Sequence, residues 1–120
     1  MSVEDELEPI NLNMFKGNNA DWKCTVINAD DNVVDITSAT VTFRVKDSLE
    51  GNVLFSRTST GGSDEIEKTD ATNGEFVIKV IPANTENLDT NNMYYYDLEI
   101  DLDGIGVKTV AYGVFTLNAK

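Results

Sequence analysis

The sequence lacks histidine altogether, contains one cysteine and two prolines, and has few basic residues: nine Lys and Arg stand against 21 Asp and Glu. Without His, every Ser–His or Cys–His nucleophilic arrangement and every His-based zinc site is excluded. A single cysteine cannot form an intrachain disulfide or a thiolate metal cage. We expect no nucleic-acid partner, because a chain with a net charge of −12 and no Lys/Arg cluster repels phosphate groups.

Long apolar runs are also missing: nowhere do 18 apolar residues follow one another, so we expect no membrane-spanning helix. The first 13 residues, MSVEDELEPINLN, contain neither a basic segment nor an apolar run, so no secretory signal is expected. Residues 1–9 include Glu4, Asp5 and Glu6, and we predict that they form a flexible acidic arm, which either contacts a basic partner or serves only as a solubilising tail. Cys24 alternates with polar neighbours, which predicts a core position and suits folding in a reducing cytoplasm.

Hydrophobic side chains recur with a period of two, which is typical of half-buried antiparallel strands. Clusters of Gly, Asn and Asp separate the candidate segments. With 120 residues and 41% hydrophobic content, the chain is predicted to form one all-β domain over residues 10–120, a sandwich of about seven or eight strands. The candidate strands are residues 10–14, 22–28, 41–46, 53–58, 76–80, 94–101 and 107–117.

Two connections are predicted to carry the chain between elements of the sandwich. Pro82 begins a segment, residues 82–88, that can form a single helical turn after a strand, and Leu88 is expected to enter the core. This turn would take the chain from one sheet to the other. Residues 35–40 would join two further strands across another edge of the sandwich.

Two acidic loops are candidates for calcium binding. Asp101-Leu-Asp103-Gly resembles the start of a calcium loop, but the closing Glu is missing, which favours an Asp-Gly hairpin turn. Asp30, Asp31 and Asp35 form a second acidic group that we interpret as a solvated loop. Calcium binding at either loop is left open, and no cofactor or resident metal is predicted.

Enzymatic chemistry is not predicted. A glycosidase pair needs two carboxylates that face each other across a cleft, about 5–9 Å apart. Asp97 and Glu99 are expected to point outward from a convex sheet face. The glycines are isolated and form no phosphate-binding loop. We therefore predict no catalytic residues.

Candidate protein-contact residues lie in the last two predicted strands. Tyr95 is expected to point outward between two core-facing tyrosines. Packing over neighbouring strand residues is favoured for it, and a protein contact is the next alternative, since an exposed Tyr can anchor one. The last strand has apolar residues on both faces, with Val110, Tyr112 and Val114 on one of them. Two apolar faces indicate that something beyond the core of the domain covers one.

The order of these segments resembles the Ig-like N-terminal domain of phage baseplate upper proteins and of related small tail or virion proteins. The resemblance covers residues 12–118. It depends on Asp-Ile-Thr-Ser-Ala-Thr at 35–40, Tyr-x-Tyr-Asp at 94–97 and Gly-x-Phe-Thr at 113–116. Independently of it, the glycine at 113 is expected to allow a close backbone approach or a bulge.

The resemblance implies a non-enzymatic virion protein with an Ig-like sandwich that docks in repeated copies onto other phage structural proteins in a symmetric assembly. It leaves open whether the station is the baseplate, tail, neck or a fibre attachment, and whether the chain forms a homo-oligomer. Multidomain relatives continue into a coiled linker, whereas this sequence ends at Lys120, so a stand-alone adaptor is expected. The alternative is a carbohydrate-binding or cell-surface Ig-like module that uses Tyr95, Tyr112 and Trp22, although Trp22 is expected on the core face.

Overall fold

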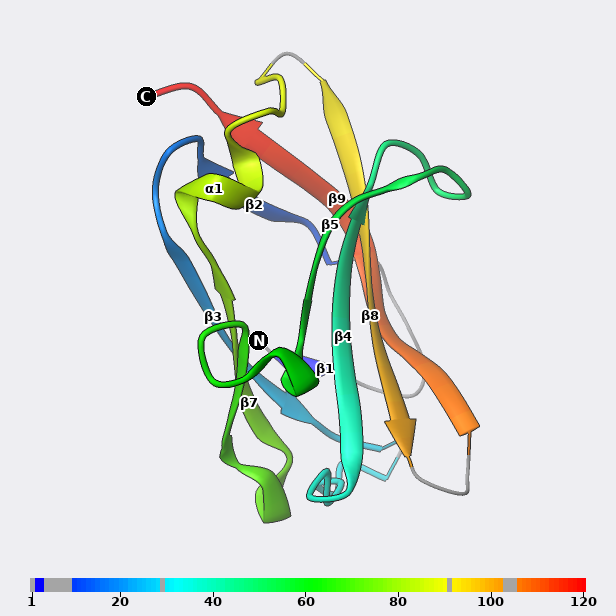
Figure 1. The fold of residues 1–120 in the computed structure, drawn as a ribbon. Coiled ribbons are helices and arrows are strands. Elements are labelled where there is room, and N and C mark those ends of the chain that lie inside the picture. The colour runs from blue at the N-terminus through cyan, green and yellow to red at the C-terminus, as the bar shows by residue number, and fades with distance from the viewer. Residues whose placement is uncertain (1, 4–9, 29, 91, 103–105) are drawn as a thin grey trace.

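A computed structural model describes residues 2–3, 10–28, 30–90, 92–102 and 106–120. The described residues form nine strands, one α-helical turn and two short 3-10 turns (Figure 1). The strands are β1 Ser2–Val3, β2 Leu12–Phe15, β3 Ala20–Val26, β4 Ala39–Lys46, β5 Val53–Thr58, β6 Ile66–Asp70, β7 Glu75–Val80, β8 Met93–Leu102 and β9 Gly106–Asn118. The turns are η1 Ser59–Gly61, η2 Ala71–Asn73 and α1 Pro82–Thr85. No helix among them is long and apolar enough to cross a membrane.

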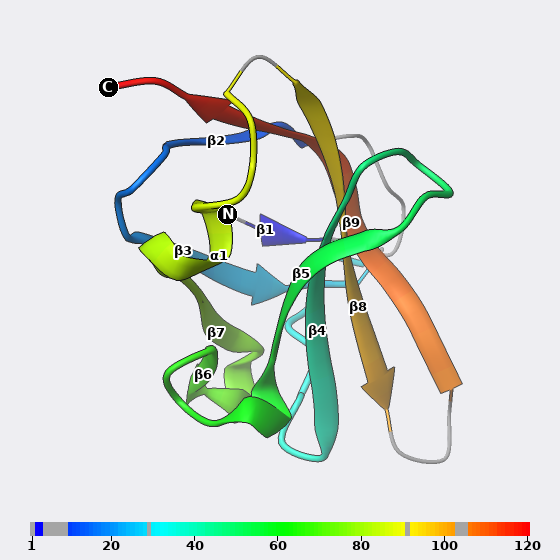
Figure 2. The ribbon, with the colours of Figure 1, turned by 45° about the horizontal axis from the view of Figure 1, so that its top comes forward.

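The strands form two sheets that face each other as a sandwich, which confirms the predicted fold class (Figure 2). The smaller sheet has the order β1-β3-β7-β6 and the larger one β2-β9-β8-β4-β5. Most neighbouring strands are antiparallel, but β1 pairs parallel with β3 and β2 pairs parallel with β9. The first two strands, β1 and β2, are therefore parallel edge strands, one in each sheet.

Alternating side chains of both sheets fill the core between them. Trp22 packs edge-on against Phe115 with ring centroids 6.2 Å apart, and it lies 5.9 Å from Phe43. Cys24 is buried as predicted, and burial raises the pKa of its thiol to about 12. The thiol is therefore a neutral core group at physiological pH. Tyr96 is buried as well, as the alternation of the tyrosine strand predicts.

The two predicted connections between the sheets are present. α1 begins at Pro82, and the Ile81 N–H donates to Oδ1 of Asn84 at 2.9 Å, which supports the start of the turn. Leu88 then packs against the core before β8 begins in the opposite sheet. Residues 35–40 likewise lead from β3 in the smaller sheet to β4 in the larger one.

A close backbone contact fixes the start of the domain on the larger sheet. The Ile10 N–H donates to the Tyr112 carbonyl at 2.9 Å, and the Tyr96 hydroxyl donates to the Ile10 carbonyl. A Cβ at Gly113 would meet the Ile10 backbone well inside contact distance. Gly113 is therefore needed for a close approach, as the sequence predicts, and not for its φ angle.

Candidate interaction surface

The outer face of the five-stranded sheet collects most of the surface residues that the sequence singles out. In the register of β8 and β9, Tyr95 lies opposite Val114, and Asp97 lies opposite Tyr112. On the other side of β8, Tyr95 lies opposite Lys46 of β4. Side chains of paired residues share a face of the sheet, so the structure brings Tyr95, Tyr112 and Val114 together.

One half of this face is occupied by ion pairs. Arg44 Nε lies 3.0 Å from Oδ1 of Asp97, and the same guanidinium also pairs with Glu99. Lys46 Nζ lies 2.7 Å from the second carboxylate oxygen of Asp97. Asp97 and Glu99 are thus bound to cations on an open sheet face instead of facing each other across a cleft. Their arrangement is that of an ion-pair network.

The other half of the face is apolar and more exposed. Met93 is 61% exposed, and the Tyr95 hydroxyl lies 3.6 Å from its sulfur atom. Leu49, which is 64% exposed, lines a shallow hollow of about 440 Å³ together with Ser48, Glu50 and Tyr95. We call Leu49, Met93, Tyr95 and Val114 the apolar end of the outer face. Met93 and Leu49 are exposed whereas Tyr95 is half-buried, and aromatic and thioether side chains of this kind are typical anchors of protein contacts.

Val110 does not belong to this surface, because it is 2% exposed and lies in the core. The ladder of β8 and β9 contains a bulge: Leu98 pairs with Ala111 whereas Glu99 pairs with Thr109. Val110 is the extra residue, so it and Ala111 both turn inward. The apolar residues on both faces of the last strand are therefore explained in part by this bulge.

Sequence reasoning missed Met93 and Leu49. The alternation of β8 contained the signal for Met93. Side chains two residues apart in a strand lie on the same face, and Met93 lies two residues before the outward Tyr95. Leu49 carries no such signal, since it lies in the turn between β4 and β5, where alternation has ended.

The acidic loop at 30–35 is organised by its own hydrogen bonds. The Thr37 N–H and hydroxyl donate to Oδ1 of Asp35 at 2.9 and 2.6 Å, and these bonds lower the pKa of Asp35 below its usual value. Asn28 Oδ1 accepts from the N–H groups of Asp30 and Asn32. Asp31 adopts a positive φ of 62°, a turn conformation that Asp tolerates.

The remaining predicted acidic residues lie in the N-terminal arm and in or beside the loop between β8 and β9. Glu4, Asp5 and Glu6 of the acidic arm and Asp103 of the second acidic loop lie outside the described residues, and Asp101 is exposed at the end of β8. Within the part of the chain that the structure describes, no group of three or more His, Cys, Asp or Glu side chains is placed to hold a metal ion.

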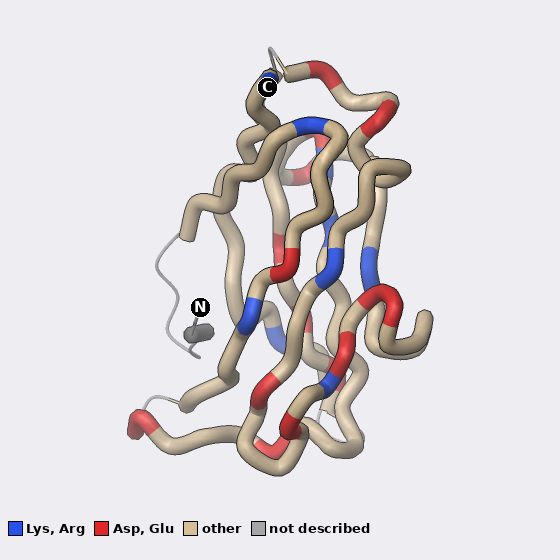
Figure 3. The backbone as a smooth tube through the Cα atoms, turned by 90° about the vertical axis from the view of Figure 1, so that its left-hand side faces the viewer, with Lys and Arg blue, Asp and Glu red and all other residues tan. Residues whose placement is uncertain are grey.

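Acidic positions dominate the loops at both ends of the sandwich, whereas basic positions lie mostly along the strands (Figure 3). The exposed acidic residues at the end that joins β3 to β4 and β6 to β7 are Asp30, Asp31, Asp35, Asp70 and Glu75. Among the described residues, these acidic side chains therefore gather at one end of the sandwich.

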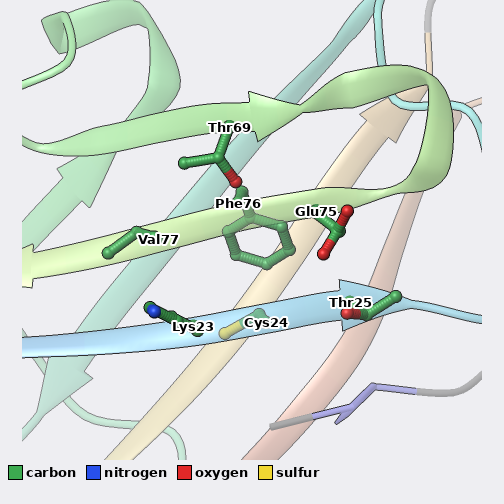
Figure 4. A pocket seen from close by; sticks show the side chains of 7 residues that line it. All are labelled: Lys23, Cys24, Thr25, Thr69, Glu75, Phe76 and Val77. Carbon is green, nitrogen blue, oxygen red and sulfur yellow. The ribbon is translucent and has the colours of Figure 1, made fainter.

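A second shallow hollow of about 400 Å³ lies on the smaller sheet, across β6, β7 and β3 (Figure 4). Thr69, Glu75, Val77 and Lys23 line it together with Thr25, Cys24 and Phe76. Burial keeps the Cys24 thiol of this hollow protonated, so it is not a reactive thiolate.

Comparison with known proteins gives a likeness of fold. No family model matches the chain, and no curated protein matches its sequence. Among solved structures, the N-terminal domain of ORF48 of phage TP901-1 superposes with a TM-score of 0.56 at 11% sequence identity. The match covers 98% of this chain and 94% of that domain. The two chains therefore share their fold over almost their whole length.

Proposed function

We propose that this chain is a non-enzymatic structural protein of a phage virion. In this proposal it is an Ig-like component of the baseplate, tail, neck or fibre attachment that folds in the host cytoplasm and then docks in repeated copies onto other virion proteins. The observation that carries the proposal is the likeness of fold to a phage domain over 98% of the chain. The sequence motifs, taken separately, resemble the same kind of phage domain.

The apolar end of the outer face is the surface that we propose for docking. Tyr95 and Met93 touch each other, and Leu49 borders the hollow beside Tyr95, so these side chains form a continuous anchor region. The ion pairs of Arg44 and Asp97 adjoin it and would form a polar rim. An apolar centre with a charged border is the usual anatomy of a protein interface.

Mass spectrometry of purified particles tests the proposal, using a phage whose genome encodes this chain. We expect peptides of the chain in the particles, in a fixed ratio to the tail and capsid proteins that corresponds to several copies. Tyr95→Ser should reduce incorporation by about tenfold, because it removes an interface anchor. Val77→Ser, on the outer face of the smaller sheet, is the matched control and should be incorporated normally. Absence of the unaltered chain from particles would refute the virion role.

A further inference from the structure

The free edge of β5 presents backbone groups that the fold leaves open. The Thr58 N–H donates to Oε1 of Glu65 at 3.1 Å and therefore points away from β4. In an antiparallel ladder this orientation recurs every second residue, so the N–H and carbonyl of Ser56 also point away from β4. Ser56 is exposed, and β5 is the outermost strand of its sheet (Figure 1). An extended chain can therefore hydrogen-bond at Ser56.

Apolar side chains flank this open position. Val45 pairs with Phe55 but Lys46 pairs with Val53, so Leu54 is the extra residue of a bulge at the end of the strand. Leu54 is 39% exposed and Val53 is 49% exposed. Their side chains offer apolar contacts to a strand that pairs along Ser56.

The two ends of the edge are acidic. Asp47 and Glu50 are exposed in the turn before β5, and Asp64 is exposed in the turn after it. The nearby cations are engaged elsewhere: Lys46 pairs with Asp97, and Arg57 donates to the Lys79 and Asp64 carbonyls. The edge therefore complements a strand that carries positive charge at its ends.

The same charges disfavour a second copy of this chain as the occupant. A two-fold pairing of β5 with itself about Ser56 would bring the turn at 47–52 of one copy beside the turn at 62–65 of the other. Glu50 of each copy would then approach Asp64 of its neighbour, and like charges across a strand pair are destabilising.

We propose that β5 binds an extended segment of a partner protein by strand addition, and that this segment has an apolar centre and Lys or Arg at its ends. The proposal deepens the virion role and rests on it for the partner being a protein. The backbone of Ser56 supplies the hydrogen bonds, Val53 and Leu54 supply apolar contacts, and the turns at 47–52 and 62–65 select for positive charge.

Two synthetic peptides test the proposal by NMR titration of the labelled full chain. One has alternating valine and threonine with a lysine at each end, and the other carries glutamate at the ends. We expect the lysine peptide to shift the amide signals of Leu54 and Ser56 and to slow hydrogen exchange at Ser56. Ser56→Pro, which removes the donor, should weaken binding about tenfold, whereas Ser56→Ala keeps the N–H and should bind as before.

Three results would overturn the inference. Equal binding of the glutamate peptide would contradict the charge selection, and an absence of shifts with both peptides would contradict strand addition. Concentration-dependent shifts at Ser56 without peptide would show that a second copy is the occupant. Shifts confined to Tyr95 and Met93, unaltered by Ser56→Pro, would overturn the edge site and leave the proposed virion role standing.

Discussion

β2 and β5 lie at opposite edges of the five-stranded sheet, and the chain fixes them by different means. The segment around β2 is tied to its neighbours at several points. The Tyr96 hydroxyl holds the Ile10 carbonyl, Asn11 Oδ1 accepts from the Val114 N–H at 3.2 Å, and the Lys16 ammonium donates to the Leu88 carbonyl at 2.7 Å. The segment around β2 therefore fits closely against the rest of the domain, and we call it the tied edge.

β5 pairs with β4 along one edge and is held to the smaller sheet by a core-facing side chain. On its other edge, the Thr58 N–H at the end of the strand donates to Glu65. Arg57, which is 8% exposed, reaches across to the smaller sheet and donates to the carbonyls of Lys79 and Asp64 at 2.8 and 2.9 Å. Ser56 and Leu54 face outward and are exposed. The comparison indicates that the contacts around β2 and the core-facing contacts of β5 stabilise the fold. The backbone edge of β5 at Ser56 is left available for a partner strand.

The largest expected effect comes from adding a side chain at Gly113, where the backbone of Ile10 lies close to β9. Gly113→Val should lower the free energy of unfolding by about 3 kcal/mol, because the new side chain would push the Ile10 backbone off β9. Urea denaturation measures the loss. Thr116→Val adds apolar volume on the exposed face of the same strand and should change stability by less than about 0.5 kcal/mol. Equal stability of both variants would show that the β2 edge is not closed by this fit.

The second effect separates the two sides of β5. Arg57→Met should cost about 2 kcal/mol, because it removes the donor to the Lys79 and Asp64 carbonyls and with it the link between β5 and the smaller sheet. Ser56→Ala, one residue away and facing outward, should be nearly neutral. Thermal unfolding of the two variants, compared with the unaltered chain, checks the difference. If both variants are neutral, Arg57 does not hold β5 to the smaller sheet.

Much of the tied edge was predictable from the sequence. Alternation places Tyr96 in the core, and a glycine amid strand residues indicated a close approach at position 113, which the Ile10 backbone confirms. The parallel pairing of β2 with β9 was not predictable, because alternation gives the face of a residue but not the direction of its partner strand. β6 was missed because Ile66 is its one buried residue and leaves no period to detect.

The candidate surface was predictable only in part. Tyr95 is expected to point outward and Val114 to share a face with Tyr112, but the pairing of Tyr95 with Val114 across two strands is seen only in the structure. The bulge that turns Val110 inward depends on the pairing of two strands, so neighbouring apolar residues were interpreted as two faces. The sequence does not show that the backbone groups of Ser56 are open, because their direction depends on the hydrogen-bond pattern between paired strands.

The effect that is smallest near neutral pH, and that grows only at alkaline pH, is the loss of stability on ionisation of two buried groups. Burial raises the pKa of Cys24 from 9.0 to about 12, and burial also raises the pKa of Tyr96 above its ordinary 10.0. In both cases the folded chain keeps a proton that the unfolded chain releases. The stabilisation is therefore complete below the unfolded pKa and is lost as the pH rises, by about 1.4 kcal/mol per pH unit for one group.

For the tied edge, the contribution of Tyr96 is the informative part, because its hydroxyl must keep the proton that it donates to the Ile10 carbonyl. Melting temperatures between pH 8 and 11 should fall in the unaltered chain. They should fall less steeply above pH 9 in Cys24→Ala and less steeply above pH 10 in Tyr96→Phe. β5 contains no Cys or Tyr, so Ser56→Ala should follow the unaltered chain throughout this range. An unchanged slope in Tyr96→Phe would mean that its hydroxyl does not stay protonated at the tied edge, and that the closure depends on the fit at Gly113 alone.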